Sequence, residues 1–126
     1  MNATASGKIF LARMPVEEVD RIMSKCTKKY TSSTITSFAR MKQEIATVKK
    51  MGYARNVEEL LPGYWVLAAG VVGRDNRPVA AISITLPLQD FAAERETAIA
   101  ALLKETARKT SLQFGHSGMA RGIAWQ

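Results

Sequence analysis

The chain has 126 residues, 18 basic and 11 acidic, which gives a formal net charge of +7. The length suits one domain with a real core, and 47% hydrophobic with 23% charged residues is ordinary globular composition. A mean hydropathy of −0.07, without an apolar run of about 20 residues, argues against an integral membrane protein.

A single cysteine, Cys26, excludes a disulfide framework and an all-cysteine zinc site. The first residues have no basic segment before an apolar stretch, so no secretory signal is predicted and a cytoplasmic location is expected. No residues have metal-ligand spacing, and no cofactor is expected. The basic residues are scattered without aromatic alternation, which favours solvated surfaces over direct nucleic-acid binding.

Two helices are predicted first. Residues 3–13 form a buried helix around the apolar run Ile9, Phe10 and Leu11. Pro15 suits a first helical turn and begins the second helix. Its predicted apolar face comprises Val16, Val19, Ile22, Met23 and Cys26. Residues 27–36, rich in Lys, Thr and Ser, are predicted to form a loop.

A third helix is predicted over Phe38–Met51, with Ser37 as its N-cap and Gly52 just past its end. Its apolar stripe comprises Phe38, Met41, Ile45 and Val48. Such a stripe needs a buried partner, most simply a sheet. Three strands are predicted next, at Gly52–Val57, Tyr64–Val72 and Val79–Leu86. Turn residues at 58–63 and 73–78 separate them.

The last predicted element is a long helix from an N-cap at Asp90 to about Phe114, ended by Gly115. Its inward residues are predicted to be Phe91, Ile99, Leu102, Leu103 and Ala107. Residues 116–126 are expected to be a flexible tail beyond a domain of residues 1–115. The element order is ααα-βββ-α, an antiparallel sheet with helices on it, so the predicted class is α+β.

Small residues gather at the start of the first helix, in Ala3-Thr-Ala-Ser-Gly7. Free backbone N–H groups at a helix start can hold a carboxylate, and small residues also allow tight helix packing. Both interpretations stay open. The segment is not a phosphate loop, because Asn2 replaces the first glycine and Ile9 replaces the magnesium-binding Ser or Thr.

The third strand has one small, polar face, which comprises Val79, Ala81, Ser83 and Thr85. The opposite face is predicted to be core and comprises Ala80, Ile82, Ile84 and Leu86. Pairing Val72 with Val79 would place Ala68 opposite Ser83, and Val66 opposite Thr85. This line is either the floor of a polar cavity, with two hydroxyls, or a solvent-exposed surface.

Catalytic patterns are weak. Cys26 and His116 are the only pair that could support thiol chemistry, and His116 falls in the predicted tail. Glu58 and Glu59 are adjacent, and we expect them to be turn charges or partners of nearby basic residues. No enzyme activity is predicted.

Five segments follow the order and spacing of one family. They are Ala3-Thr-Ala-Ser-Gly-Lys8 with Leu11-Ala12, Tyr30-Thr31-x-x-Thr34-Ile35-Thr36, Val48-x-x-x-Gly52-Tyr53-Ala54, Glu58-Glu59-x-x-x-Gly63, and Ala80-Ala81-Ile82-Ser83-Ile84 before Pro87. Together they resemble the IclR-type transcription regulators over residues 1–115. The resemblance implies a GAF-like effector-binding domain, a curved antiparallel sheet with helices on both sides that takes small organic acids. It also implies that the winged helix-turn-helix, through which the family binds DNA, and the domain's amino-terminal strands are missing from this chain.

The resemblance implies a ligand site as well. The resemblance places the backbone that receives a carboxylate at Ala5 and Ser6, and we expect the backbone N–H of Gly7 to bind it as well. The other family positions correspond to Asn56, Val66, Ser83 and Thr85. Asn56 cannot carry the charge of the family's Asp, and Val66 offers no side-chain hydrogen bond. Asn2 replaces the family's His. We therefore expect a less polar or different effector.

Three functions are compatible with these observations. The first is a sensing domain that binds a small organic acid and couples it to homo-oligomerisation and DNA-binding control. The second is an interaction or dimerisation module without its own ligand, because a partial domain exposes a sheet edge. The third and weakest is nonspecific DNA binding through the +7 charge.

Overall fold

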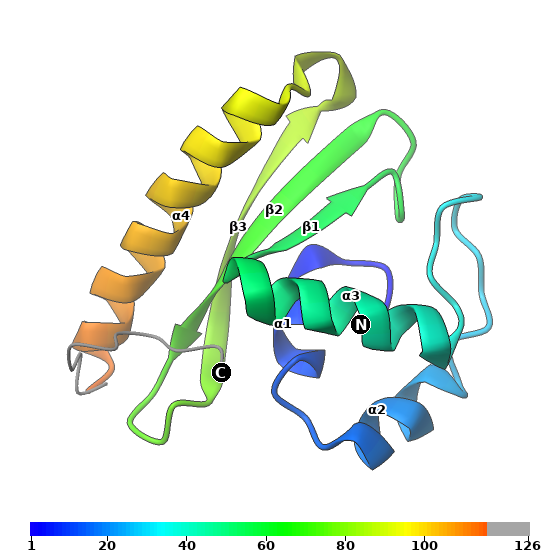
Figure 1. Ribbon diagram of the computed structural model, residues 1–126, viewed down its shortest axis with the longest axis horizontal. Coiled ribbons are helices and arrows are strands. Elements are labelled where there is room, and N and C mark those ends of the chain that lie inside the picture. Colours follow the sequence, from blue (N-terminus) through cyan, green and yellow to red (C-terminus); the bar gives the residue numbers. More distant parts are fainter. Residues whose placement is uncertain (116–126) are drawn as a thin grey trace.

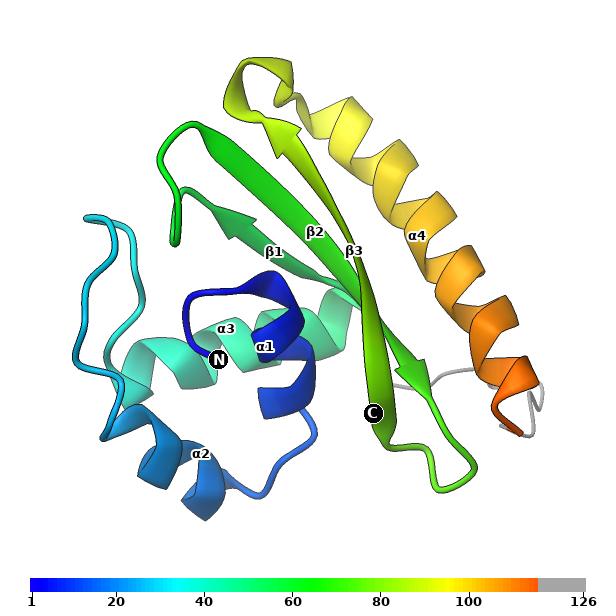
Figure 2. The ribbon, with the colours of Figure 1, turned by 180° about the vertical axis from the view of Figure 1, so that it is seen from behind.

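The computed structural model describes residues 1–115. Its elements are the helices α1 (Ala5–Leu11), α2 (Val16–Met23), α3 (Phe38–Met51) and α4 (Ala93–Gln113), the strands β1 (Ala54–Val57), β2 (Tyr64–Val72) and β3 (Pro78–Pro87), and the 3₁₀ turn η1 (Leu88–Asp90). The strands form an antiparallel sheet in the order β1-β2-β3. Helix α4 covers one face of the sheet, and α1 and α3 lie on the other (Figures 1 and 2). The predicted α+β class is confirmed.

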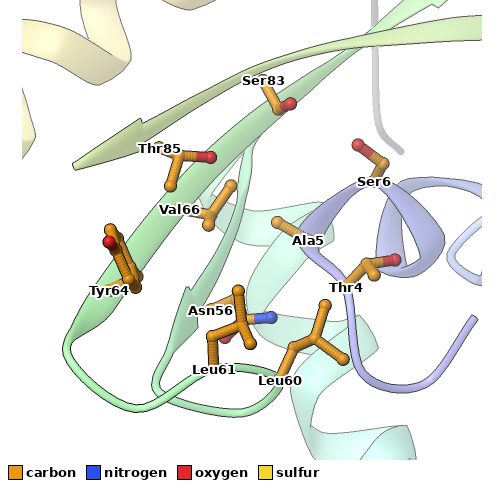
Figure 3. Close-up of a pocket in the computed structure, with 10 residues that line it drawn as sticks. All are labelled: Thr4, Ala5, Ser6, Asn56, Leu60, Leu61, Tyr64, Val66, Ser83 and Thr85. Atoms are coloured by element: carbon orange, nitrogen blue, oxygen red, sulfur yellow. The ribbon is translucent and has the colours of Figure 1, made fainter. Parts of the chain in front are cut away.

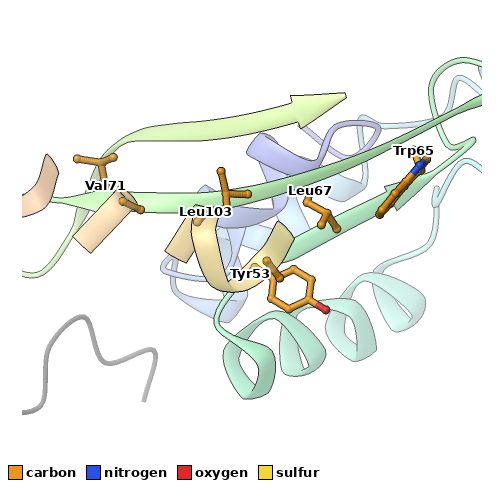
Figure 4. Packing of buried hydrophobic residues seen from close by; sticks show 8 residues of the cluster. Tyr53, Trp65, Leu67, Val71 and Leu103 are labelled. Carbon is orange, nitrogen blue, oxygen red and sulfur yellow. The ribbon is translucent and has the colours of Figure 1, made fainter. Parts of the chain in front are cut away.

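Strand β2 explains why the sheet is covered on both sides. Its side chains alternate between the two faces, yet nearly all are apolar. Trp65, Leu67, Ala69 and Val71 pack under α4, against Leu103 and its helical neighbours (Figure 4). Ala68 faces the other way and joins the cluster of α1 and α3. A strand that is apolar on both faces needs both layers of helices.

Helix α3 has the predicted bounds because its end signals are local. The Ser37 hydroxyl accepts a hydrogen bond from the Arg40 N–H at 3.1 Å. Gly52 ends the helix with a left-handed φ of 81°, which glycine adopts without steric cost. The chain then enters β1 directly. The strand predicted at Gly52–Val57 is therefore shorter, because Gly52 caps α3 and β1 begins only at Ala54.

The first two helices are shorter than predicted. Helix α1 begins after Thr4, whose hydroxyl accepts the Gly7 N–H at 3.0 Å, and covers less than the predicted residues 3–13. Helix α2 ends at Met23, so Cys26 lies beyond it, half-buried against the same cluster. Val16 lies outside that cluster and is 52% exposed, which contradicts its predicted inward position.

The start of the last helix also differs from the prediction. Asp90 belongs to η1 and caps nothing, since α4 begins only after Ala92. Phe91 has extended backbone between the two and is 39% exposed. Leu102 is 71% exposed, because the 100° rotation per residue turns it away from the sheet when Leu103 faces it. Gly115 adopts a left-handed φ of 82° just past the helix, as predicted.

Strand β3 confirms the predicted register, with one change. Ala68 lies opposite Ser83, and Val66 opposite Thr85. A bulge between Val71 and Val72 pairs Val72 with Pro78, where Val79 was predicted. Ile84 was predicted to be core but is 38% exposed, because α4 packs mainly over β2 and leaves β3 at the edge. Within residues 1–115, no helix is long and apolar enough to cross a membrane.

Candidate functional site

A pocket of about 290 Å³ opens between the start of α1, the β1–β2 turn and the face of β2 and β3 that α1 covers. Its lining residues are Thr4, Ala5, Ser6, Asn56, Leu60, Leu61, Tyr64, Val66, Ser83 and Thr85 (Figure 3). Six of the seven predicted site residues are among them. Gly7 is not. The predicted positions come from four separate elements, α1, β1, β2 and β3, and the fold brings them to one cavity.

The hydroxyl groups of the pocket come from two elements. Ser83 and Thr85 project from β3, and Ser6 lies across from them on α1 (Figure 3). Ser83 and Thr85 are exposed, so the predicted floor is open to solvent and to a ligand alike. Ala5 and Ser6 are the first two residues of α1, whose N–H groups have no acceptor inside the helix. Donors therefore face the cavity from both sides.

Gly7 has a packing role. Its N–H is engaged by Thr4, and a Cβ on Gly7 would lie 2.0 Å from the Met1 carbonyl oxygen. The chain start thus packs directly on α1, and only glycine leaves room for it. The small residues of this segment thus allow tight packing and also place a helix start beside the cavity. Tight packing and carboxylate binding, the two interpretations of these residues, are therefore compatible.

Asn56 is buried, and both ends of its side chain are hydrogen-bonded. Its Nδ2 donates to the Ala3 carbonyl at 2.6 Å, and its Oδ1 accepts the Glu59 N–H at 2.9 Å. These two bonds join the chain start to the β1–β2 turn. Asn56 was predicted to contact a ligand. Its side-chain amide instead joins two walls of the pocket.

The β1–β2 turn supplies an apolar wall that sequence reasoning missed. Leu60 and Leu61 line the cavity from this turn, and Tyr64 follows at the start of β2. Glu58 adopts a left-handed φ of 55° and its carboxylate accepts the Gly63 N–H at 2.9 Å, which closes the turn. A leucine pair inside a segment otherwise typical of turns was the available signal.

A buried ion cluster stands behind this wall. Lys8 is fully buried, and its Nζ donates to Glu44 Oε1 at 2.8 Å, to the Arg55 carbonyl at 2.7 Å and to Glu59 Oε2 at 3.0 Å. Burial raises the pKa of Glu59, and the neighbouring Lys8 ammonium opposes that shift. Of the two alternatives for Glu59, a solvated turn charge does not fit a residue that is 8% exposed. Glu59 does pair with a basic residue, but that partner, Lys8, lies 51 residues earlier and is not local in sequence.

The loop before α3 also supports the turn. Thr34 Oγ1 donates to the Glu59 carbonyl at 2.6 Å, and the Thr31 hydroxyl donates to the Glu58 carbonyl. Both threonines belong to a segment that carries the family resemblance. The turn that bears the apolar wall is thus tied to α1, to α3 and to this loop.

The pocket is lined by hydroxyl, amide and apolar side chains. No charged side chain is among its lining residues. Within residues 1–115, no group of three His, Cys, Asp or Glu side chains could hold a metal ion. His116 lies outside the described residues, so of the weak Cys26–His116 pattern only Cys26 is placed, half-buried beyond the end of α2.

Comparison with known proteins gives consistent matches. The family model "Bacterial transcriptional regulator IclR C-terminal" matches residues 1–112. The transcriptional repressor IclR of Escherichia coli K12 is 33% identical over 116 residues, which are 91% of this chain and 42% of that protein. The regulator KdgR of Escherichia coli K12 is 34% identical over 115 residues, 90% of this chain and 44% of that protein. The chain thus spans less than half the length of these curated relatives.

Solved structures match as well. The crystal structure of the C-terminal domain of Escherichia coli KdgR superposes with a TM-score of 0.85 and 34% identity, over 91% of this chain and 71% of that one. The Agrobacterium tumefaciens repressor BlcR superposes with a TM-score of 0.87 at 23% identity, over 91% of this chain and 47% of that one, a likeness of fold.

Proposed function

Because the chain belongs to the family of bacterial IclR-type regulator C-terminal domains, we propose that it is the effector-binding domain of a cytoplasmic transcription regulator, and that the pocket binds a small organic acid. The observation that carries this proposal is the convergence of donors on one cavity. Backbone N–H groups of Ala5 and Ser6 stand on one side, and the hydroxyls of Ser83 and Thr85 on the other. Such donors, with no acidic side chain among the lining residues, suit a carboxylate.

The proposed mechanism gives each predicted residue a role. Ala5, Ser6, Ser83 and Thr85 donate to the carboxylate, and Val66 forms the apolar floor between them. Asn56 acts through the two backbones that it joins, and Gly7 through the close packing of α1.

A bound acid would connect α1 with the edge strand β3. If the acid binds more tightly to the conformation in which α1 and β3 both contact it than to others, it would shift the domain toward that conformation. In a longer regulator, that shift would change homo-oligomerisation, and through it the affinity of a DNA-binding domain for its operator.

Replacing Ser83 and Thr85 with valine tests this role. The double variant S83V/T85V places a good strand former at two exposed positions of β3, isosteric at Thr85 and slightly larger at Ser83, so the fold is expected to survive. It removes two hydrogen bonds to a charged group, worth about 1.5–3 kcal/mol each. We expect affinity for the bound acid to fall at least about 100-fold, measured by titration calorimetry with an acid found by thermal shift in a panel of small carboxylates.

The matched control is T106V/T110V. Thr106 is exposed and Thr110 half-buried on α4, away from the pocket, and each donates its hydroxyl to a carbonyl of its own helix. The control should bind like the wild type. Unchanged affinity in S83V/T85V would remove β3 from the site, and a panel in which no acid raises the melting temperature would count against the whole proposal.

A second candidate function is an interaction module, and the edge of β3 favours it. All ten residues of Pro78–Pro87 are uncharged, whereas exposed edge strands commonly carry charges that prevent pairing with other chains. We expect sedimentation equilibrium to show concentration-dependent dimers that Ile84→Lys abolishes. A wild-type monomer at high concentration would remove this candidate and leave the ligand site untouched.

A further inference from the structure

The pocket is chemically divided along its length. The hydroxyls of Ser6 and Ser83 lie toward one end, and the side chains of Leu61 and Tyr64 toward the other (Figure 3). Leu60 completes the apolar end from the same turn. A ligand that places its polar group among the hydroxyls therefore extends its remaining atoms over hydrocarbon.

The apolar end offers no compensation for a second charge. Two cations on the neighbouring elements α1 and β1 are paired elsewhere: Lys8 is fully buried and bonded to Glu44 and Glu59, and Arg55 is ion-paired with Glu96 at 3.7 Å. Arg55 also lies over the Phe91 ring, on the side of the sheet where Trp65 packs. A second carboxylate pressed against Leu60 and Leu61 would lose water and gain no cation in its place, which is costly.

The same end presents apolar surface that a ligand can cover. Leu61 is 57% exposed and Tyr64 is 46% exposed, although both line the cavity. Covering such surface is favourable in proportion to the apolar area removed from water. The volume of about 290 Å³ is near the lower limit of ligand pockets, which are about 300–1,000 Å³, so the covering group must be small.

We propose that the pocket selects small monocarboxylic acids with an apolar body, and that Leu60, Leu61 and Tyr64 determine this specificity against dicarboxylic and polyhydroxy acids. The inference rests on the proposed function, since it assigns the part of the ligand beyond the carboxylate. It adds three specificity residues on the β1–β2 turn and the start of β2.

The test compares defined acids on the chain itself by titration calorimetry. Acetate, butyrate and hexanoate probe the apolar body, succinate a second charge, and gluconate a polyhydroxy body. We expect affinity to rise about fourfold per methylene buried until the pocket is full. Hexanoate is expected to bind at least tenfold more tightly than succinate or gluconate.

The variant Leu61→Ser should flatten the dependence on chain length and leave acetate affinity within about twofold. Leu102→Ser is its control, because Leu102 is exposed on α4 and should change neither quantity. Tighter binding of succinate or gluconate than of hexanoate would overturn this inference while the proposed function stood. A dependence on chain length that persists in Leu61→Ser would also overturn it, and binding of no acid at all would overturn both.

Discussion

Replacing Lys8 with methionine is expected to lower the free energy of unfolding by about 3–5 kcal/mol, because the change leaves the buried carboxylate of Glu59 and the half-buried one of Glu44 without their counter-ion. Methionine keeps most of the volume but donates nothing to Glu44, Glu59 or the Arg55 carbonyl. The loss should be smaller below pH 4.5, the ordinary pKa of Glu59, and grow as pH rises, since only ionised Glu59 needs the ammonium. Urea unfolding followed by circular dichroism at several pH values measures it.

Two further variants separate the ion cluster from a general effect of losing a lysine. Lys109→Met, on the exposed face of α4, should change stability by no more than about 0.5 kcal/mol. In Lys8→Met/Glu59→Gln the unpaired carboxylate is gone, so the two losses should be non-additive by about 0.5–3 kcal/mol. Strict additivity would mean that Lys8 stabilises the fold by packing alone.

Trp65→Ala is the second large effect, and we expect it to cost about 3–5 kcal/mol of stability. Trp65 is fully buried under α4, its Nε1 donates to the Pro87 carbonyl at 3.1 Å, and its ring meets the edge of Phe91 at a centroid distance of 5.0 Å. The variant therefore loses core volume and the contacts that fix the connection from β3 to α4. The shift in denaturant midpoint between variant and wild type measures the loss, provided that the m-value of unfolding is unchanged.

The comparison for this variant is Leu102→Ala. Leu102 is 71% exposed on the same helix that covers Trp65, so its truncation should change stability by no more than about 0.5 kcal/mol. Trp65→Phe should fall between the two, because it keeps an aromatic ring and loses the bond to Pro87. A loss below about 1 kcal/mol in Trp65→Ala would show that the core collapses around the vacancy.

Elements with local end signals were predictable. Ser37 and Gly52 set the ends of α3, and the turn residues on either side of Tyr64–Val72 set β2 with its predicted bounds. The start of α4 was not predictable in this way. Ala92 provides no side-chain cap, and the helix direction is set by η1 and by the packing of Phe91 on Trp65, which are tertiary contacts.

The candidate site divides similarly. The period of two along β3 identified Ser83 and Thr85 as neighbours on one face, and the structure places both in the pocket. The position of Leu60 depends on the turn that Glu58 closes with a positive φ, and no local sequence pattern predicts that conformation for a glutamate. Lys8 was missed because a lysine on a helix is ordinarily solvated, whereas its partners lie 36 to 51 residues further along the chain.

The buried position of α1 has a consequence for the order of folding. Helix α1 packs on α3 and on β1, β2 and β3, so its main partners lie between residues 38 and 87, which a ribosome makes later. A helix of seven residues is too short to persist alone in water. The segment around Ser6 must therefore remain unstructured during synthesis until the β2–β3 hairpin has emerged. Completion of the hairpin and assembly of the cavity are then one late event, and nascent chains cannot form the site in advance.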